Sequence, residues 1–93
     1  MPTQEILQAI LEFNYNHHHN LLIELELVRK QRQWLTRVLS VPLPPLYSSS
    51  QQRILQYLYR IVLNRDFTIL QELVNVTSLI RDLRILLRTR TIQ

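Results

Sequence analysis

The spacing of apolar residues is the feature that most restricts how this chain of 93 residues can fold. Over the first 39 residues they recur at positions that fall on one side of an α-helix over five heptads. This stripe consists of Leu7, Ile10, Leu11, Leu21, Leu25, Val28, Leu35 and Leu39. The segment 14–20 has poor helix propensity. We therefore predict one long helix over about 3–39, with 14–20 as the place where it could break.

The second half of the sequence predicts two shorter helices after a Pro/Ser linker over 40–48. The prolines end the first helix, because proline lacks an amide hydrogen and disfavours α geometry at the residue before it. Ser49 and Gln52 have the spacing of a capping box and predict a helix over about 49–63. Its expected buried stripe is Ile54, Tyr57, Leu58, Ile61 and Val62. Asp66 is the expected N-cap of a further helix over about 67–88.

These patterns predict a single all-α domain over 1–93, a helical hairpin or bundle of one long N-terminal helix and two C-terminal helices. The chain has no glycine for tight turns and no cysteine for disulfides. A domain of this size buries only about two-thirds of its unfolded surface, so its core needs another support. We expect homodimerisation to complete the bundle, with a monomeric three-helix hairpin as the alternative. The expected dimer interface is Leu21, Leu25, Val28, Leu35, Leu73, Val76, Ile80, Leu83 and Leu87.

Charge is distributed unevenly, and arginine dominates the basic residues. Residues 1–27 carry four acids and no Lys or Arg, whereas residues 28–40 carry four basic residues and no acid. Arginine favours bidentate contact with phosphate or carboxylate groups. Double-stranded RNA is recognised by its shape and phosphates, so an arginine-lined helix face could bind it without a base-reading motif. The expected nucleic-acid-binding residues are Arg29, Lys30, Arg32, Arg37, Arg81, Arg84 and Arg88. Pairing with acids or shielding of apolar edges is the alternative role.

The sequence offers no credible catalytic, cofactor or metal site. His17, His18 and His19 are consecutive and therefore diverge by about 100° each around a helix. Helical metal pairs need a spacing of three or four residues, and the positions that would supply it, 21–23, are Leu, Leu and Ile. No nucleophile has a base and an orienting group at a recognisable spacing. We expect no enzyme, no cofactor and no metal.

Trp34 is the candidate anchor for a protein partner, because aromatic residues dominate binding energy at interfaces. Packing in the core is its alternative role. No segment reads as a membrane span or a signal peptide. We expect a protein without membrane contact, located inside the cell and in the cytoplasm.

The composition suggests an unusual origin for the gene. Glycine is absent, and there is one Ala and one Lys against ten Arg, although about six glycines are expected at this length. We interpret this as a gene read out of frame over an older one, as in viral accessory proteins; a composition skewed by helical structure is the alternative. In length and general plan the chain resembles the helical silencing suppressors of insect nodaviruses, which are also small and dimeric. This resemblance implies suppression of RNA silencing, and it assigns no residue.

Two functions follow from these observations. The first is a non-enzymatic, self-associating protein that binds double-stranded RNA through an arginine-lined face. The second is a helical adaptor or assembly factor that binds a protein and no nucleic acid.

Overall fold

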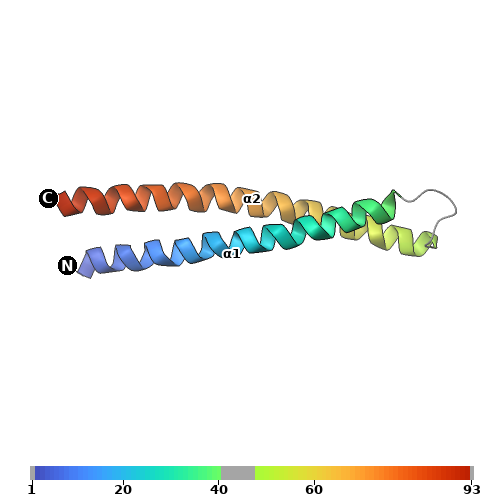
Figure 1. The fold of residues 1–93 in the computed structure, drawn as a ribbon, viewed down its shortest axis with the longest axis horizontal. Coiled ribbons are helices and arrows are strands. Elements are labelled where there is room, and N and C mark those ends of the chain that lie inside the picture. The colour runs from blue at the N-terminus through green and yellow to red at the C-terminus, as the bar shows by residue number, and fades with distance from the viewer. Residues whose placement is uncertain (1, 41–47, 93) are drawn as a thin grey trace.

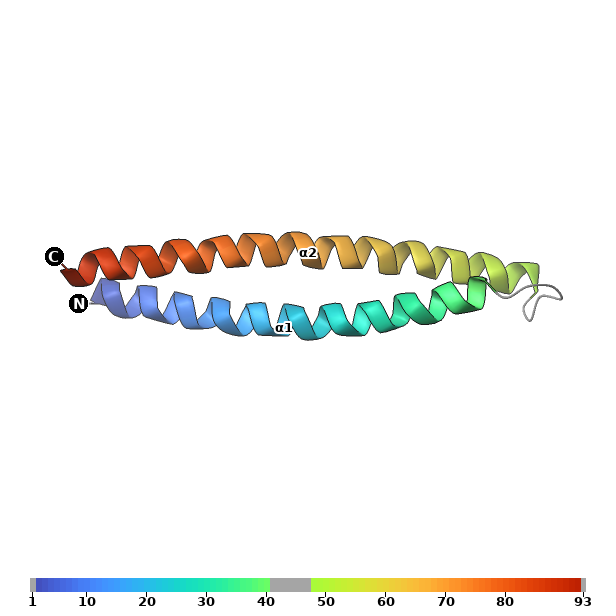
Figure 2. The same ribbon diagram turned by 45° about the horizontal axis from the view of Figure 1, so that its top comes forward.

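Two long antiparallel helices make up the fold. The structure is a computed structural model that describes residues 2–40 and 48–92. Helix α1 spans Pro2–Leu39 and helix α2 spans Ser49–Ile92. They lie side by side, with the start of α1 and the end of α2 at one end of the molecule, and the end of α1 and the start of α2 at the other (Figures 1 and 2). The all-α class is therefore confirmed for the described residues.

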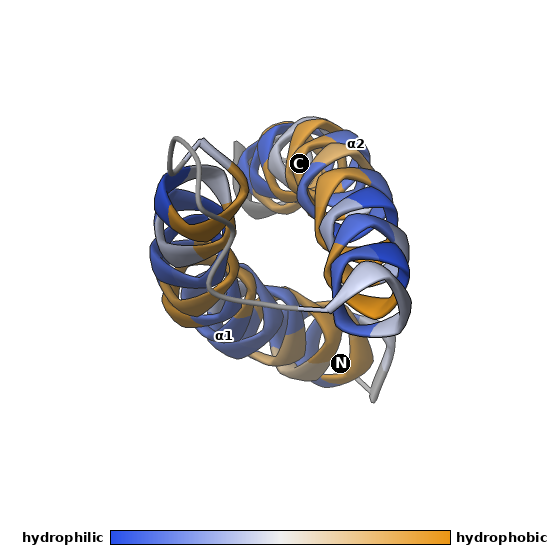
Figure 3. Cartoon of the chain, turned by 90° about the vertical axis from the view of Figure 1, so that its right-hand side faces the viewer, coloured by the Kyte–Doolittle hydropathy of each residue, from blue (hydrophilic) through white to orange (hydrophobic). Residues whose placement is uncertain are grey.

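The hairpin is long and thin. Its Cα positions extend over 71 × 17 × 14 Å. The radius of gyration is 20.5 Å, whereas a compact domain of this length has a radius of about 12 Å. Seen end-on, the helices wind around each other (Figure 3). No third layer of structure covers the outer sides of the helices in the part of the chain that the structure describes.

The prediction of three helices was wrong. The first helix is continuous through 14–20, as expected, but α2 continues without a break through residues 64–66. Asp66 is not an N-cap, because it lies in the interior of α2 and its carboxylate contacts arginines on α1. Arg65 likewise pairs with Glu24 on α1. Contacts with the other helix therefore override the capping preference of Asp66 that the local sequence suggests.

The start of α2 has a capping box one residue earlier than predicted. The backbone amide of Ser48 donates to Gln51 Oε1 at 2.9 Å, and the backbone amide of Gln51 donates to Ser48 Oγ at 3.3 Å. Ser48 is thus the N-cap, and the predicted pair of Ser49 and Gln52 does not form the box. The prolines that were expected to end the first helix, Pro42, Pro44 and Pro45, lie outside the described residues.

A single apolar seam joins α1 to α2. On both helices the seam positions repeat at alternating steps of three and four residues, which is the heptad pattern of a coiled coil. The buried apolar residues of the seam are Leu11, Leu21, Leu25, Val28 and Leu35 on α1, and Leu55, Val62, Ile69, Val76, Ile80 and Leu83 on α2. Leu73 and Leu87 are partly buried against them. All nine residues expected at a dimer interface therefore pack within one chain, because α2 covers the stripe of α1 that a second copy was expected to cover.

The stripe predicted for 49–63 was wrong for four of its five residues, and only Val62 is buried as expected. Leu55, Tyr59 and Val62 face the seam, whereas Ile54, Tyr57, Leu58 and Ile61 are exposed. This segment is apolar on two sides, so its sequence fits two helical phases. The side that packs on α1 is the one whose positions continue the heptad repeat of residues 66–87.

We predict that Ile69→Ala lowers the free energy of unfolding by about 2–4 kcal/mol, because it removes buried methyl groups and leaves a cavity. Ile69 is 1 % exposed and lies at the middle of the seam. Ile85→Ala is the matched control, since Ile85 lies on the same helix and is 53 % exposed. We expect the control to change stability by less than about 1 kcal/mol. Urea denaturation followed by circular dichroism measures both, and equal losses would contradict this assignment of the seam.

Candidate interaction surfaces

The hairpin has two long sides, one on each side of the seam, and each side is formed by both helices. At 100° per residue, the residues that flank the seam fall into two groups on each helix. Glu24 and Arg65 form an ion pair that bridges the helices on one side. Trp34, Leu58 and Ile61 line a common groove on this same side. We name this side the Trp34 face.

The Trp34 face carries exposed apolar residues at its two ends and polar residues between them. Near the linker the loop-end patch consists of Leu27, Trp34, Ile54, Leu58 and Ile61. Near the chain ends the open-end patch consists of Ile6, Ile10, Phe13, Leu79 and Leu86. Every one of these ten side chains is exposed in the hairpin. Trp34 itself is 54 % exposed, so its alternative role as a core residue is not observed.

The opposite side, which we name the arginine face, carries most of the exposed arginines. They are Arg29 on α1 and Arg53, Arg60, Arg81, Arg84 and Arg88 on α2. Three acids of α1, Glu5, Glu12 and Glu26, share this face. Between the two groups of arginines on α2 lie exposed apolar residues, among them Phe67 and Val74. The arginine face therefore combines a basic helix, an acidic helix end and an apolar centre.

Asp66 is the most unusual residue of the seam. It occupies a heptad core position and is 5 % exposed. Arg32 Nη1 donates to Asp66 Oδ2 at 3.5 Å, and Arg29 Nε lies 3.8 Å from the same oxygen. Arg32 also occupies a seam position, with its side chain about half exposed. The only buried carboxylate among the described residues is thus paired with two residues that the sequence suggested for RNA binding.

The remaining residues predicted to bind nucleic acid lie on the outer surface. Lys30 pairs with Glu26 one turn earlier, at 3.5 Å, and both side chains are about 70 % exposed. Arg37 is exposed on the back of α1. Arg81 Nε lies 3.5 Å from Asp82 Oδ1, and Arg81, Arg84 and Arg88 line a shallow hollow on α2 with Ile85. The structure brings these three together and separates them from Lys30 and Arg37.

The three histidines do not converge. His17 stacks on Phe13 with ring centroids 6.4 Å apart, His18 is half-buried at a seam position, and His19 is exposed. Within residues 2–40 and 48–92 there is no group of three or more His, Asp or Glu side chains that could hold a metal ion.

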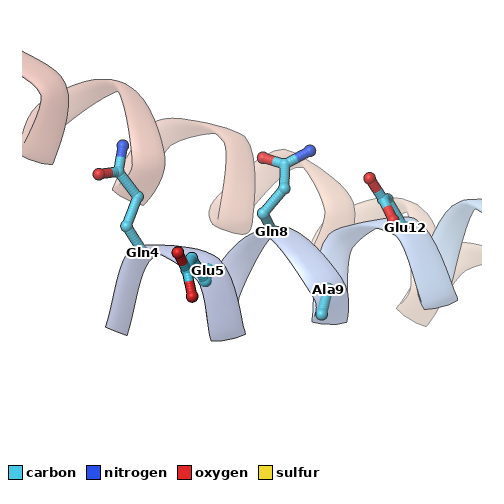
Figure 4. A pocket seen from close by; sticks show the side chains of 5 residues that line it. All are labelled: Gln4, Glu5, Gln8, Ala9 and Glu12. Atoms are coloured by element: carbon cyan, nitrogen blue, oxygen red, sulfur yellow. The ribbon is translucent and has the colours of Figure 1, made fainter. Parts of the chain in front are cut away.

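A second hollow lies on the surface of α1. Its lining comes from Gln4, Glu5, Gln8, Ala9 and Glu12, all within three turns of one helix (Figure 4). This is an acidic and amide-lined surface to which none of the described side chains of α2 contributes. Its chemistry is hydrogen bonding to a polar or basic partner.

No family model, curated protein or solved structure matches this chain. Neither described helix is long and apolar enough to cross a membrane. The surfaces of the hairpin are therefore the basis for any functional proposal.

Sequence reasoning missed two features of these surfaces. It treated Asp66 as a cap, although its position on the heptad register of 69–87 could have placed it in the seam. It also identified Trp34 as a candidate anchor without its apolar counterpart on α2. That counterpart follows once Leu55 and Val62 are assigned to the seam, because Ile54, Leu58 and Ile61 then face outward.

We predict that Asp66→Asn lowers the free energy of unfolding by about 1–2 kcal/mol, because it removes a charge-assisted contact from the seam. Asp82→Asn is the control, since Asp82 is exposed and pairs with its sequence neighbour, and we expect a change of less than about 0.5 kcal/mol. The double variant Arg32→Leu with Asp66→Leu should be at least as stable as the wild type, because apolar packing replaces a partly buried ion pair. Urea titrations compare the variants, and a double variant less stable than the wild type would contradict this reasoning.

Proposed function

We propose that this chain is a non-enzymatic, self-associating helical binding protein that acts by packing its exposed helix faces against other helices. The observation that carries the proposal is the amount of apolar surface left outside the seam. Nineteen large hydrophobic residues among those described are exposed, whereas eleven hydrophobic residues are buried. Helices that are apolar on several sides need cover on each of them.

The total surface of the hairpin supports this proposal. A compact monomer of this mass exposes about 5,700 Å² of accessible surface. The hairpin exposes 7473 Å². The excess is similar to the total area of about 1,600 Å² that a stable interface of ordinary size buries. The hairpin therefore has enough surplus surface for one such interface without losing its own seam.

We predict that the purified chain sediments as a dimer or larger assembly at micromolar concentration. The single hairpin is thin, with a longest extent of 71 Å. Sedimentation velocity should give the assembly a lower frictional ratio than a single hairpin would have, because lateral packing makes the particle thicker. If the chain remains a single extended subunit at all concentrations up to about 100 µM, any self-association has a dissociation constant above that of ordinary specific complexes. That result would rule the proposal out.

A second candidate, binding of duplex RNA, is favoured by one observation. Arg81, Arg84 and Arg88 are exposed along one edge of α2, and Arg53 and Arg60 extend that edge towards the linker. Such a row could neutralise phosphates of a duplex without reading bases. We propose suppression of RNA silencing as the activity that such binding would serve. Two features disfavour it: Arg29 and Arg32 contact Asp66, and Glu5 and Glu12 share the arginine face.

On this second candidate, Arg81→Ala with Arg84→Ala should abolish the gel shift of a duplex RNA of about 20–25 base pairs at low salt. Lys30→Ala with Arg37→Ala is the charge-matched control, since it removes the same two charges from the back of α1. We expect the control to keep most of the affinity. Absence of any wild-type shift at low salt would eliminate RNA binding, and equal losses would show that the contact is not at this edge.

A further inference from the structure

We propose that the Trp34 face binds a second copy of this chain in antiparallel orientation. The open-end patch of each copy then packs on the loop-end patch of the other, and the two hairpins form a four-helix bundle. This inference rests on the proposed self-association and adds the surface and the orientation. It also differs from the dimer that the sequence suggested, which used the seam now occupied within each chain.

Four of the five apolar residues of α1 on this face are arranged symmetrically along the helix, and Ile10 is the exception. Phe13 and Leu27 lie seven residues on either side of Asn20, and Ile6 and Trp34 lie fourteen residues on either side of it. If a two-fold axis passes by Asn20, Phe13 of one copy therefore meets Leu27 of the other, and Ile6 meets Trp34. Such an interface is isologous, because the same surface of both copies takes part.

Four of the five apolar residues of α2 on this face have the same symmetry about residue 70, whereas Leu58 falls opposite Asp82. Ile61 and Leu79 lie nine residues on either side of it, and Ile54 and Leu86 lie sixteen residues on either side. The ion pairs between the helices, Glu24–Arg65, Arg29–Asp66 and Arg32–Asp66, place residue 20 level with a position between 69 and 78. A two-fold axis beside Asn20 therefore passes within about two helical turns of residue 70.

Charge at the centre of the face fits the antiparallel orientation. With the axis at Asn20, His17 of one copy lies opposite Glu24 of the other. On α2, Arg65 comes within one turn of Glu72 of the second copy.

The arginine face is a poorer site for a second copy. In an antiparallel pair its Arg60 would lie near Arg81 of the other copy, and like charges in contact repel. Across the described side chains the Trp34 face carries three acids and one arginine, namely Glu24, Glu72, Asp82 and Arg65. The arginine face thus remains open for other contacts when the Trp34 faces meet.

The two phenylalanines of the chain allow a matched test of the surface. Phe13 lies on the Trp34 face and is 69 % exposed, whereas Phe67 lies on the arginine face and is 70 % exposed. Phe13→Asp should raise the dimer dissociation constant at least about tenfold, because it buries a carboxylate in the interface twice. Phe67→Asp should leave it unchanged within about threefold. Sedimentation equilibrium measures both, and circular dichroism confirms that each variant remains helical.

Disulfide trapping tests the orientation, because the wild-type chain contains no cysteine. Asn20→Cys places a thiol beside the proposed axis, so oxidation should link two copies of this variant. His19→Cys is the control, since His19 is the exposed neighbour on the other side of the helix. Failure of Asn20→Cys to form a disulfide dimer, or equal linkage of both variants, would overturn the antiparallel arrangement.

The outcomes separate this inference from the proposed function. A wild-type chain that remains a single subunit would defeat both. A wild-type dimer that persists in Phe13→Asp but dissociates in Phe67→Asp would keep self-association and reject the Trp34 face. A dimer that dissociates in Phe13→Asp but shows no linkage through Asn20→Cys would keep the face and reject its antiparallel use.

Discussion

The apolar seam between α1 and α2 is the constraint on which every other surface depends. Each helix supplies a heptad stripe of nearly the same length, and burying these stripes fixes which sides of the helices remain outside. Once Leu35 and Val62 pack in the seam, Trp34 and Ile61 must lie on one side of it and Arg29 and Leu63 on the other. The outer faces are therefore consequences of the seam's phase.

Polar residues within the seam add specificity to a pattern that apolar residues alone leave ambiguous. A purely apolar stripe can slip by one heptad without losing contacts. Asp66 opposes such a slip, because its carboxylate is satisfied only where Arg29 and Arg32 reach it. Asn14 is also buried in the seam, and its side-chain amide donates to the Ile10 carbonyl oxygen at 2.8 Å. The seam thus exchanges some apolar burial for a defined alignment.

The sequence was sufficient for the class of fold and for the long first helix, and insufficient wherever the answer depended on the other helix. The heptads of 69–87 identified the seam of α2, but they could not show whether α1 of the same chain or of another copy covers it. The serine run 48–50 offers several equivalent caps, so the box was displaced by one residue. Asp66 has the local character of an N-cap, and only its arginine partners on α1 explain why the helix continues.

The connection of the two helices at one end only predicts a gradient of local stability along the hairpin. Residues that meet near the linker are close in sequence, whereas those that meet near the chain ends are separated by most of the chain. Local unfolding should therefore begin at the chain ends and proceed towards the linker. In the antiparallel pair the weaker end of each copy rests on the firmer end of the other. Each hairpin would then stabilise the less stable end of its neighbour, and assembly would slow amide hydrogen exchange most at the chain ends, where a single hairpin frays.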